Sequence, residues 1–225
     1  HQEIVYFRKM ILFKIILSPF SLIYWILSSS RNALFKWGLL QQYKSRIPVI
    51  SVGNLCMGGS GKTPHVALII EHLTDYNKAV ISRGYGRKNN ILIEANSEIH
   101  STKDTGDEPM ELLQKFEGSS FKMIIDGNRK KALRHLEMNK EKTDIVVLDD
   151  GFQHQYVKRD LNVLLTDFSN PFYKDFVLPI GRLREHRKAA KRADIIIVTK
   201  CPKDLNTALE IEIKKRIRLY SSAKI

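Results

Sequence analysis

Apolar residues fill positions 10–29 almost without interruption, in the stretch MILFKIILSPFSLIYWILSS. A helix of about 20 apolar residues is long enough to cross a bilayer. Lys14 places a charge inside the run and Pro19 removes a helix hydrogen bond, and both features disfavour a spanning helix. We therefore predict an interfacial or half-inserted pair of helices, with Lys and Arg side chains at anionic lipid.

Two other interpretations of this segment stay open. It is an ordinary buried helix, or it is a span or a signal peptide, because Ser28, Ser29 and Ser30 resemble the small residues of a cleavage site. Basic residues flank the run on both sides, so the positive-inside rule gives no orientation. Trp25 and Trp37 suit the depth of a membrane interface.

From residue 47 onward, short apolar runs alternate with helical stretches. The apolar runs lack the in-and-out alternation of a half-exposed strand, so both faces of the predicted sheet are buried, as in a parallel sheet. The pattern predicts an α/β doubly wound domain with helices on both faces, whose ligands bind at the carboxyl ends of the strands. The predicted strands cover residues 47–52, 78–82, 121–126, 144–150, 161–167 and 193–200, and the predicted helices cover 64–75, 107–117, 128–139 and 184–192.

The composition points to anionic partners. Among 225 residues, Lys and Arg exceed Asp and Glu, and the formal net charge is +13. Nucleic acid, phospholipid and a phosphorylated substrate all fit such a charge. The sequence shows no zinc pattern, aromatic RNA-binding motif or helix-turn-helix, so we expect no nucleic-acid partner. Cys56 and Cys201 are too few for a disulfide framework and fit a reducing compartment.

A glycine-rich segment follows the first predicted strand. Residues 51–66, SVGNLCMGGSGKTPHV, end like the phosphate-binding loop G-x-x-x-x-G-K-[ST], although Cys56 replaces its first glycine. In such a loop the backbone N–H groups surround phosphate, Lys62 reaches the β- and γ-phosphates, and the Thr63 hydroxyl binds Mg²⁺. A glycine-rich turn packed on the sheet is the alternative. The predicted ATP-binding residues of the loop are Gly58, Gly59, Ser60, Gly61, Lys62 and Thr63.

Carboxylates follow two other predicted elements. Asp149 and Asp150 end a strand, which is where a Walker-B carboxylate holds Mg²⁺, although Asp-Gly is also turn chemistry. Asp107 and Glu108 begin a predicted helix, and helix capping accounts for only one of them. A kinase acting on a hydroxyl needs a carboxylate to accept or orient its proton, and Asp107 is the candidate. His154 is a candidate to contact phosphate or a carboxylate.

Two basic segments add candidate anion-binding residues. In SRGYGR, residues 82–87, Arg83 and Arg87 are candidates to meet phosphate and Tyr85 to line a pocket. The segment GRLREHRKAAKR, residues 181–192, has six basic residues and one acidic residue. It is a solvated helix face, or it holds an anionic headgroup or membrane, and both interpretations stay open.

These motifs together resemble the tetraacyldisaccharide 4'-kinase family, the lipid A 4'-kinases. PVISVGNLCMGGSGKTP, SRGYGR, GDEP, LDDGFQH, RDLNVLL, GRLRE and ADIIIVTK occur in the same order as in that family, over about residues 10–202. That family typically has Ser or Thr at the position of Cys56, so a missing first glycine is a family trait.

The resemblance implies an activity and a place. Family members use ATP and Mg²⁺ to phosphorylate the 4'-hydroxyl of tetraacyldisaccharide 1-phosphate and form lipid IVA in lipid A biosynthesis. They act at the cytoplasmic face of the bacterial inner membrane, attached through the N-terminal helix. The resemblance implies no obligate protein partner; the partners expected are the lipid substrate and an anionic membrane surface.

The resemblance also implies a role for each matched residue. Asp107 matches the acid thought to act as the base, which the family pairs with a histidine. The candidate catalytic residues are Asp107, Lys62, Asp149, Asp150 and His154; those for the metal are Thr63, Glu108 and Asp149; Arg129 joins the ATP site; and those for the lipid substrate are Tyr85, Gln153 and Arg184.

We expect three regions. Residues 1–46 form the membrane-associated helical segment, residues 47–200 the P-loop kinase domain, and residues 201–225 the start of a second lobe, which in the family supplies the histidine partner of Asp107. The alternative function is a membrane-associated P-loop ATPase that acts as a switch and needs no acceptor pocket.

Overall fold

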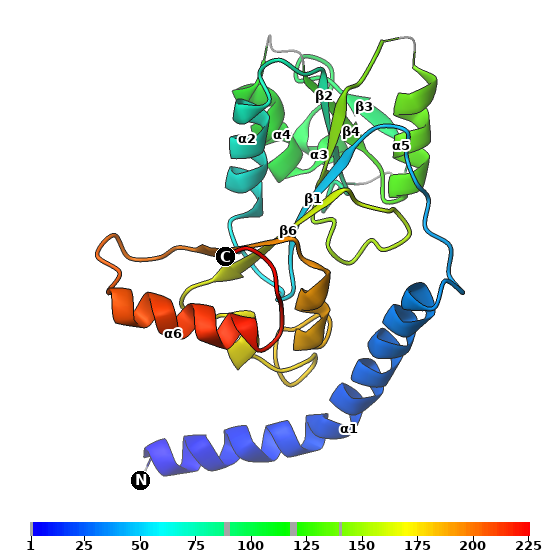
Figure 1. Cartoon of the computed structure of the whole chain (residues 1–225). Coiled ribbons are helices and arrows are strands. Elements are labelled where there is room, and N and C mark those ends of the chain that lie inside the picture. The colour runs from blue at the N-terminus through cyan, green and yellow to red at the C-terminus, as the bar shows by residue number, and fades with distance from the viewer. Residues whose placement is uncertain (1, 88–90, 118–120, 140) are drawn as a thin grey trace.

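A seven-stranded sheet forms the centre of the molecule (Figure 1). The computed structural model describes residues 2–87, 91–117, 121–139 and 141–225, and their side chains from residue 13 onward. The strand order is β3-β4-β2-β5-β1-β6-β7, and every neighbouring pair is parallel except β3 and β4. The strands are β1 (Val49–Asn54), β2 (Lys78–Ser82), β3 (Ile93–Ala95), β4 (Phe121–Ile125), β5 (Ile145–Asp149), β6 (Leu161–Asp167) and β7 (Ile195–Thr199).

Burial explains why the apolar runs form strands. All five residues of β2 are buried, and so are all but the first residue of β5. The prediction of a mostly parallel sheet with helices on both faces is confirmed. Strand β3 was not predicted, because three residues at a sheet edge, of which only Ala95 is buried, leave no recognisable pattern.

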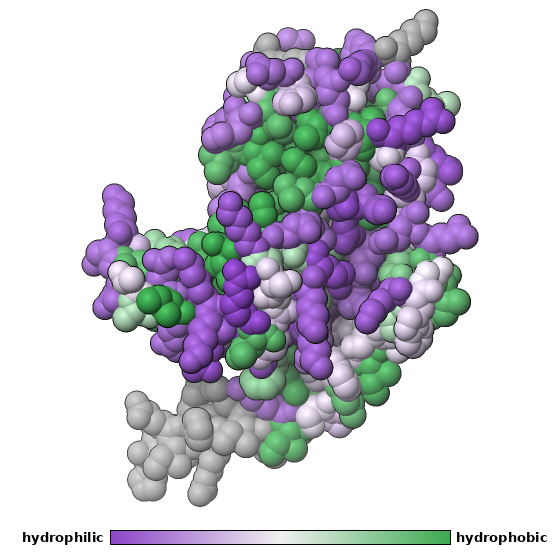
Figure 2. Space-filling model, viewed as in Figure 1, coloured by the Kyte–Doolittle hydropathy of each residue, from purple (hydrophilic) through white to green (hydrophobic). Residues whose placement is uncertain are grey.

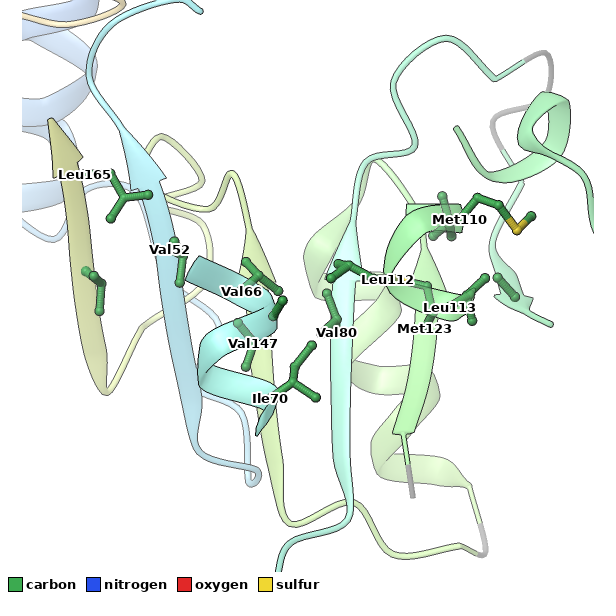
Figure 3. Close-up of a cluster of buried hydrophobic side chains, with 14 residues drawn as sticks. Val52, Val66, Ile70, Val80, Met110, Leu112, Leu113, Met123, Val147 and Leu165 are labelled. Atoms are coloured by element: carbon green, nitrogen blue, oxygen red, sulfur yellow. The ribbon is translucent and has the colours of Figure 1, made fainter. Parts of the chain in front are cut away.

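Helices cover both faces of the sheet. Helix α2 (Lys62–His72) and helix α4 (Asp107–Lys115) lie on one face, and helix α5 (Arg129–Met138) lies on the other. Figure 3 shows Val66 and Ile70 of α2 and Leu112 of α4 packing over Val52, Val80 and Val147 of the strands. On the opposite face, side chains of α5 pack against Ile81, Ile124 and Leu148.

A third apolar cluster joins the C-terminal residues to the sheet. Ile213 and Ile217 of α6 (Thr207–Arg218) pack with Leu164 of β6 and Ile196 of β7. The 3-10 helix η1 (Phe172–Lys174) contributes Phe172 to the same cluster. The division at residues 46 and 200 stays a prediction; in the described chain, the residues after 200 pack onto the sheet domain.

The predicted helix over 184–192 was wrong in its length and type. Within these residues only the 3-10 helix η2 (Arg187–Arg192) forms. A further short helix, α3 (Thr102–Thr105), precedes α4. Arg184 donates its backbone N–H to the carbonyl of Leu55, and Cys56 pairs with Leu183 in an isolated bridge. This pairing keeps the residues just before η2 out of a helix, and the His186 side chain then accepts from the N–H of Lys188 and caps η2.

The N-terminal segment forms one helix, α1 (Gln2–Lys36), instead of the predicted pair. Pro19 lies inside it, and Figure 1 shows α1 as two arms that meet at an angle, as an internal proline explains. The part from Phe13 to Lys36 is long and apolar enough to cross a membrane, which is weak evidence by itself, and only 6% of its apolar window is buried. Figure 2 shows hydrophobic side chains exposed along the lower edge of the molecule, over α1.

The sheet topology fixes where a ligand binds. Strand β1 lies between β5 and β6, so the chain leaves β1 toward one half of the sheet and later returns to the other half. In doubly wound sheets, the crevice at the carboxyl end of the strand where the order reverses is the ligand site. Here that point is the end of β1, directly before the glycine-rich loop.

Candidate active site

A cleft of about 820 Å³ opens between the carboxyl ends of β1, β2 and β5 and the inner side of α1. Most of the predicted site residues meet there although they come from distant parts of the chain. The predicted residues that line the cleft are Lys62, Tyr85, Asp107, Glu108, Arg129, Asp149, Asp150, Gln153, His154 and Arg184.

The glycine-rich loop has the backbone that a phosphate site needs. Gly58 and Gly61 have φ angles of 116° and 78°, which side-chain-bearing residues rarely adopt. Helix α2 starts at Lys62, two residues before the predicted start, so its N-terminal N–H groups face the loop. The Lys62 ammonium lies 3.8 Å from a carboxylate oxygen of Asp150, an ion pair too long to be a hydrogen bond. The ammonium therefore remains available to a phosphate.

Lys200, which the sequence did not single out for this site, holds the loop from the other side. It follows β7 with a φ of 57°, and its ammonium donates to the carbonyl oxygen of Gly59 at 2.6 Å. The same ammonium is 2.8 Å from a carboxylate oxygen of Asp167 at the end of β6. The loop is thus tied to the ends of two strands.

The two carboxylates after β5 have different environments. Asp149 is buried, and burial raises its pKa to about 6, although the Ser82 hydroxyl donates to it at 2.9 Å and opposes the shift. Arg184 donates to Asp150 at 2.7 Å. Burial disfavours the Asp150 carboxylate, but Lys62 and Arg184 outweigh this and lower its pKa. Asp150 is therefore ionised at neutral pH, and Asp149 is mostly ionised.

Arg129 and His154 lie beside these carboxylates. The Arg129 guanidinium is buried and donates to the carbonyl oxygens of Asp126 and Asp149. Burial lowers its pKa to about 10, so it stays charged at pH 7. Burial, followed by the charge of Arg129, lowers the pKa of His154 to about 4. His154 is consequently neutral at pH 7 and offers a hydrogen bond but no positive charge.

Asp107 and Glu108 face the cleft from the first turn of α4, and both are exposed. The preceding Gly106 has a φ of 91°, and a Cβ there would lie 2.8 Å from the carbonyl oxygen of Tyr85. This glycine lets the SRGYGR loop pass close to the start of α4. Tyr85 itself is 88% exposed at the mouth of the cleft.

Other predicted residues lie outside the large cleft. Gly58, Gly59 and Ser60 line a separate cavity of about 40 Å³, and Gly61 and Thr63 line neither space. Arg87 does not line the cleft, and one nitrogen of its guanidinium donates to the backbone carbonyls of Ile91 and Ile125, so its contact with phosphate stays a prediction. Arg83 does line the cleft.

One wall of the cleft comes from α1, which sequence reasoning missed. Tyr24, Ser28 and Arg31 line it, and Arg31 donates to the carbonyl oxygen of Gln153. Asn32 donates to the buried carboxylate of Glu185 at 2.7 Å. A signal for this docking existed, since polar residues recur every three or four positions from Ser21 through an otherwise apolar helix.

The carboxylates fit a divalent ion that binds together with phosphate. Within the described parts of the chain, no group of three or more His, Cys, Asp or Glu residues is placed to hold a metal ion alone. One carboxylate oxygen of Asp149 and one of Asp150 are buried with no hydrogen-bond partner in that same part of the structure. Mg²⁺ characteristically uses one or two carboxylates and completes its shell with water and substrate phosphates.

Comparison with known proteins gives one consistent family. Residues 13–224 match the family model described as "LpxK: Tetraacyldisaccharide-1-P 4'-kinase". A tetraacyldisaccharide 4'-kinase of Flavobacterium psychrophilum is 42% identical over 209 residues, which are 92% of this chain and 60% of the relative. One from Parabacteroides distasonis is 45% identical over 84% of this chain and 51% of the relative.

A solved structure agrees with the fold. The crystal structure described as the "apo" form of LpxK from Aquifex aeolicus in complex with ATP matches with a TM-score of 0.76 and 34% identity. The match covers 87% of this chain and 62% of that one. This chain thus spans between half and two thirds of the length of these relatives.

Proposed function

The chain belongs to the tetraacyldisaccharide-1-P 4'-kinase family, and on that premise we propose that it transfers the γ-phosphate of ATP to the 4'-hydroxyl of tetraacyldisaccharide 1-phosphate, forming lipid IVA. The observation that carries the proposal is the composition of one cleft. Lys62 of the phosphate loop, the acidic residues of β5 and α4, and the amphipathic wall of α1 all line it. A nucleotide phosphate and a lipid-linked hydroxyl can therefore meet there.

The position of each residue in the cleft suggests its role in phosphate binding or proton transfer. The loop N–H groups and Lys62 bind the β- and γ-phosphates, and Arg129 adds a buried positive charge near Asp149. Asp107 accepts the proton of the attacking hydroxyl, since its carboxylate is exposed to the cleft from the start of α4. Asp150, held by Arg184 and close to Lys62, orients these two cations.

The remaining assignments concern the metal and the sugar. Asp149, Glu108 and Thr63 are the residues proposed to hold Mg²⁺, which when bound neutralises charge on the phosphates. His154 is a neutral hydrogen-bond partner for phosphate or sugar. Tyr85, Gln153 and Arg184 contact the disaccharide from the rim of the cleft.

We place the protein at the cytoplasmic face of the bacterial inner membrane. The support is the exposed apolar surface of α1 from Phe13 to Ile26, which includes Trp25, together with the exposed Trp37 directly after the helix. ATP as the phosphate donor requires the cytosolic side.

The test is transfer of label from γ-labelled ATP to tetraacyldisaccharide 1-phosphate in detergent micelles, with the Flavobacterium psychrophilum relative as positive control. We expect Mg²⁺-dependent labelled lipid, abolished by Lys62→Ala. Asp107→Asn should lower transfer by about 100-fold or more while ATP still binds. If ATP is hydrolysed at the same rate by wild type and Asp107→Asn and no lipid is labelled, the membrane-associated ATPase switch replaces the kinase.

A further inference from the structure

We propose that residues 174–188, here called the lipid-facing segment, form a second contact with an anionic bilayer beside α1. In this contact the ring of Phe176 enters the interface, and Arg187 and Lys188 meet phospholipid phosphates. The proposal deepens the membrane location given under the proposed function and rests on it. The partner is the bilayer surface itself, as distinct from the reacting lipid in the cleft.

The lipid-facing segment lies directly against the apolar helix. Ser21 of α1 donates its hydroxyl to the carbonyl oxygen of Val177 at 2.7 Å, and this contact is buried. One helical turn later, the rings of Trp25 and His186 lie 6.0 Å apart. Figure 1 shows the segment, in gold, between α1 and the sheet domain. A membrane that receives the exposed side of α1 therefore also comes close to this segment.

Phe176 is presented to the outside by a fixed backbone. Its side chain is 55% exposed, whereas Phe172 and Val177 on either side of it are buried. Its N–H donates to the Asp175 carboxylate at 2.8 Å, and its carbonyl accepts from the N–H of Leu183 at 2.9 Å. With the backbone fixed in this way, the Phe176 ring cannot bury its apolar area in the core of its own domain. It can remove that area from water by inserting at a membrane interface.

A cation accompanies the ring. The Arg187 guanidinium lies 5.3 Å from the centre of the Phe176 ring, and its Nε–H donates to the carbonyl oxygen of Asp175 at 2.9 Å. A guanidinium stacked on an exposed aromatic ring places an apolar surface and a phosphate-binding group at the same depth. This is the arrangement that the boundary between acyl chains and headgroups favours.

The charge around the ring is strongly positive. Arg182 is paired with Asp175 at 3.1 Å, and the buried Glu185 is paired with Arg192 at 2.8 Å, so the acidic residues of the segment are already neutralised. The cations that remain are Lys174, Arg187 and Lys188, followed by the exposed Lys191. An anionic bilayer complements such a surface, and this separates it from a neutral protein partner.

The experiment measures partition of the full chain onto sedimented vesicles, either phosphatidylglycerol with phosphatidylethanolamine or phosphatidylcholine alone. Phe176→Ser should weaken binding to both kinds of vesicle by about tenfold, because apolar area is lost. Arg187→Gln with Lys188→Gln should weaken binding by about tenfold on the anionic vesicles only. Met138→Ser, an exposed apolar residue at the end of α5, and Lys103→Gln with Lys158→Gln are the matched controls and should bind like wild type.

The readout needs neither ATP nor the lipid substrate, so it is independent of the kinase assay. Phe20→Ser with Ile23→Ser on α1 reports whether the helix itself binds vesicles. If that variant loses binding while Phe176→Ser binds anionic vesicles like wild type, with an unchanged thermal unfolding curve, the proposal is overturned and the exposed ring belongs to a protein contact. If wild type binds vesicles and neither variant loses binding, neither α1 nor the lipid-facing segment makes the contact and the proposal is overturned. If wild type binds neither kind of vesicle, the membrane location fails as well.

Discussion

The hydroxyl of Tyr24 donates a 3.0 Å hydrogen bond to the carbonyl oxygen of Arg184, the residue whose guanidinium bonds Asp150 at 2.7 Å. Two bonds in series thus connect the apolar helix α1 to a carboxylate that faces the phosphate loop. The helix is a part of the cleft as well as a candidate anchor.

Tyr24→Phe should lower kcat/KM for the lipid about fivefold, because one hydrogen bond of about 1 kcal/mol that positions Arg184 is lost. ATP affinity should change little, since the phosphate loop is untouched. Initial rates over a range of lipid concentrations give the first value and nucleotide titration the second. Tyr76→Phe, on the surface before β2, is the control. Unaltered lipid kinetics would remove Tyr24 from the mechanism.

Lys200→Met should raise KM for ATP about tenfold with a small change in kcat, because a charged hydrogen bond to the phosphate loop is worth about 1.5–3 kcal/mol. The methionine also leaves Asp167 without its cation, so adding Asp167→Asn should restore part of the affinity. Lys203→Met is the matched control on the neighbouring loop. Equal KM values for wild type and Lys200→Met would show that this tie does not support nucleotide binding.

Asp149→Asn should stabilise the protein at pH 7.5 while abolishing transfer. Burial raises the pKa of Asp149 from 3.8 to about 6, so ionising it in the folded state costs about 3 kcal/mol. We expect the free energy of unfolding in urea to rise by about 1–3 kcal/mol. Asp204→Asn, in the loop before α6, should leave stability unchanged. A less stable Asp149→Asn variant would mean that hydrogen bonds and nearby cations offset the free-energy cost of burying the ionised Asp149 carboxylate.

His154 should make the protein acid-sensitive. Its pKa falls from 6.5 to about 4 on folding, so its contribution to stability is complete above pH 6.5 and is lost as the pH falls toward 4. Asp149 acts in the opposite sense, because its cost disappears as the pH falls from 6 toward 3.8. The advantage of wild type over His154→Gln in unfolding free energy should therefore shrink by about 2 kcal/mol between pH 7.5 and pH 5.

Urea titrations of both proteins at the two pH values measure that difference. Subtracting the two unfolding free energies removes the pH-dependent contributions of the titratable groups that both proteins contain, including Asp149. A difference between wild type and His154→Gln that is the same at both pH values would indicate that folding leaves the pKa of His154 unchanged.

Residues of the site that belong to local motifs could be predicted from the sequence, but residues that reach the site through long-range tertiary contacts could not. Lys62 and Asp149 could be predicted because the residue types at a strand end and a helix start carry their chemistry within a few positions. Lys200 could not, because its role depends on the carbonyl of Gly59, 141 positions away, and on a φ of 57°. The hydrogen bond from Tyr24 to Arg184 joins residues 160 positions apart, so it could not be predicted from the sequence either.

The fold was predictable to a similar extent. Buried strands such as β2 can be predicted because they are continuous apolar runs, whereas the three residues of β3 are too few to show a pattern that predicts a strand. At residues 184–186 the sequence favours a helix, but the pairing of Leu183 with Cys56 overrides that preference. Pro19 suggested a break into two helices, and the helix instead continues through it.

Because α1 forms one wall of the cleft and exposes its other side, the proposed acceptor never has to leave the bilayer to react. Its acyl chains stay among lipids while only the sugar reaches the phosphate loop. Encounters between protein and acceptor then take place by lateral diffusion in two dimensions. The quantity that controls the rate is the mole fraction of acceptor in the surface, and diluting the surface with inert lipid slows the reaction even when the number of acceptor molecules in the vessel is unchanged.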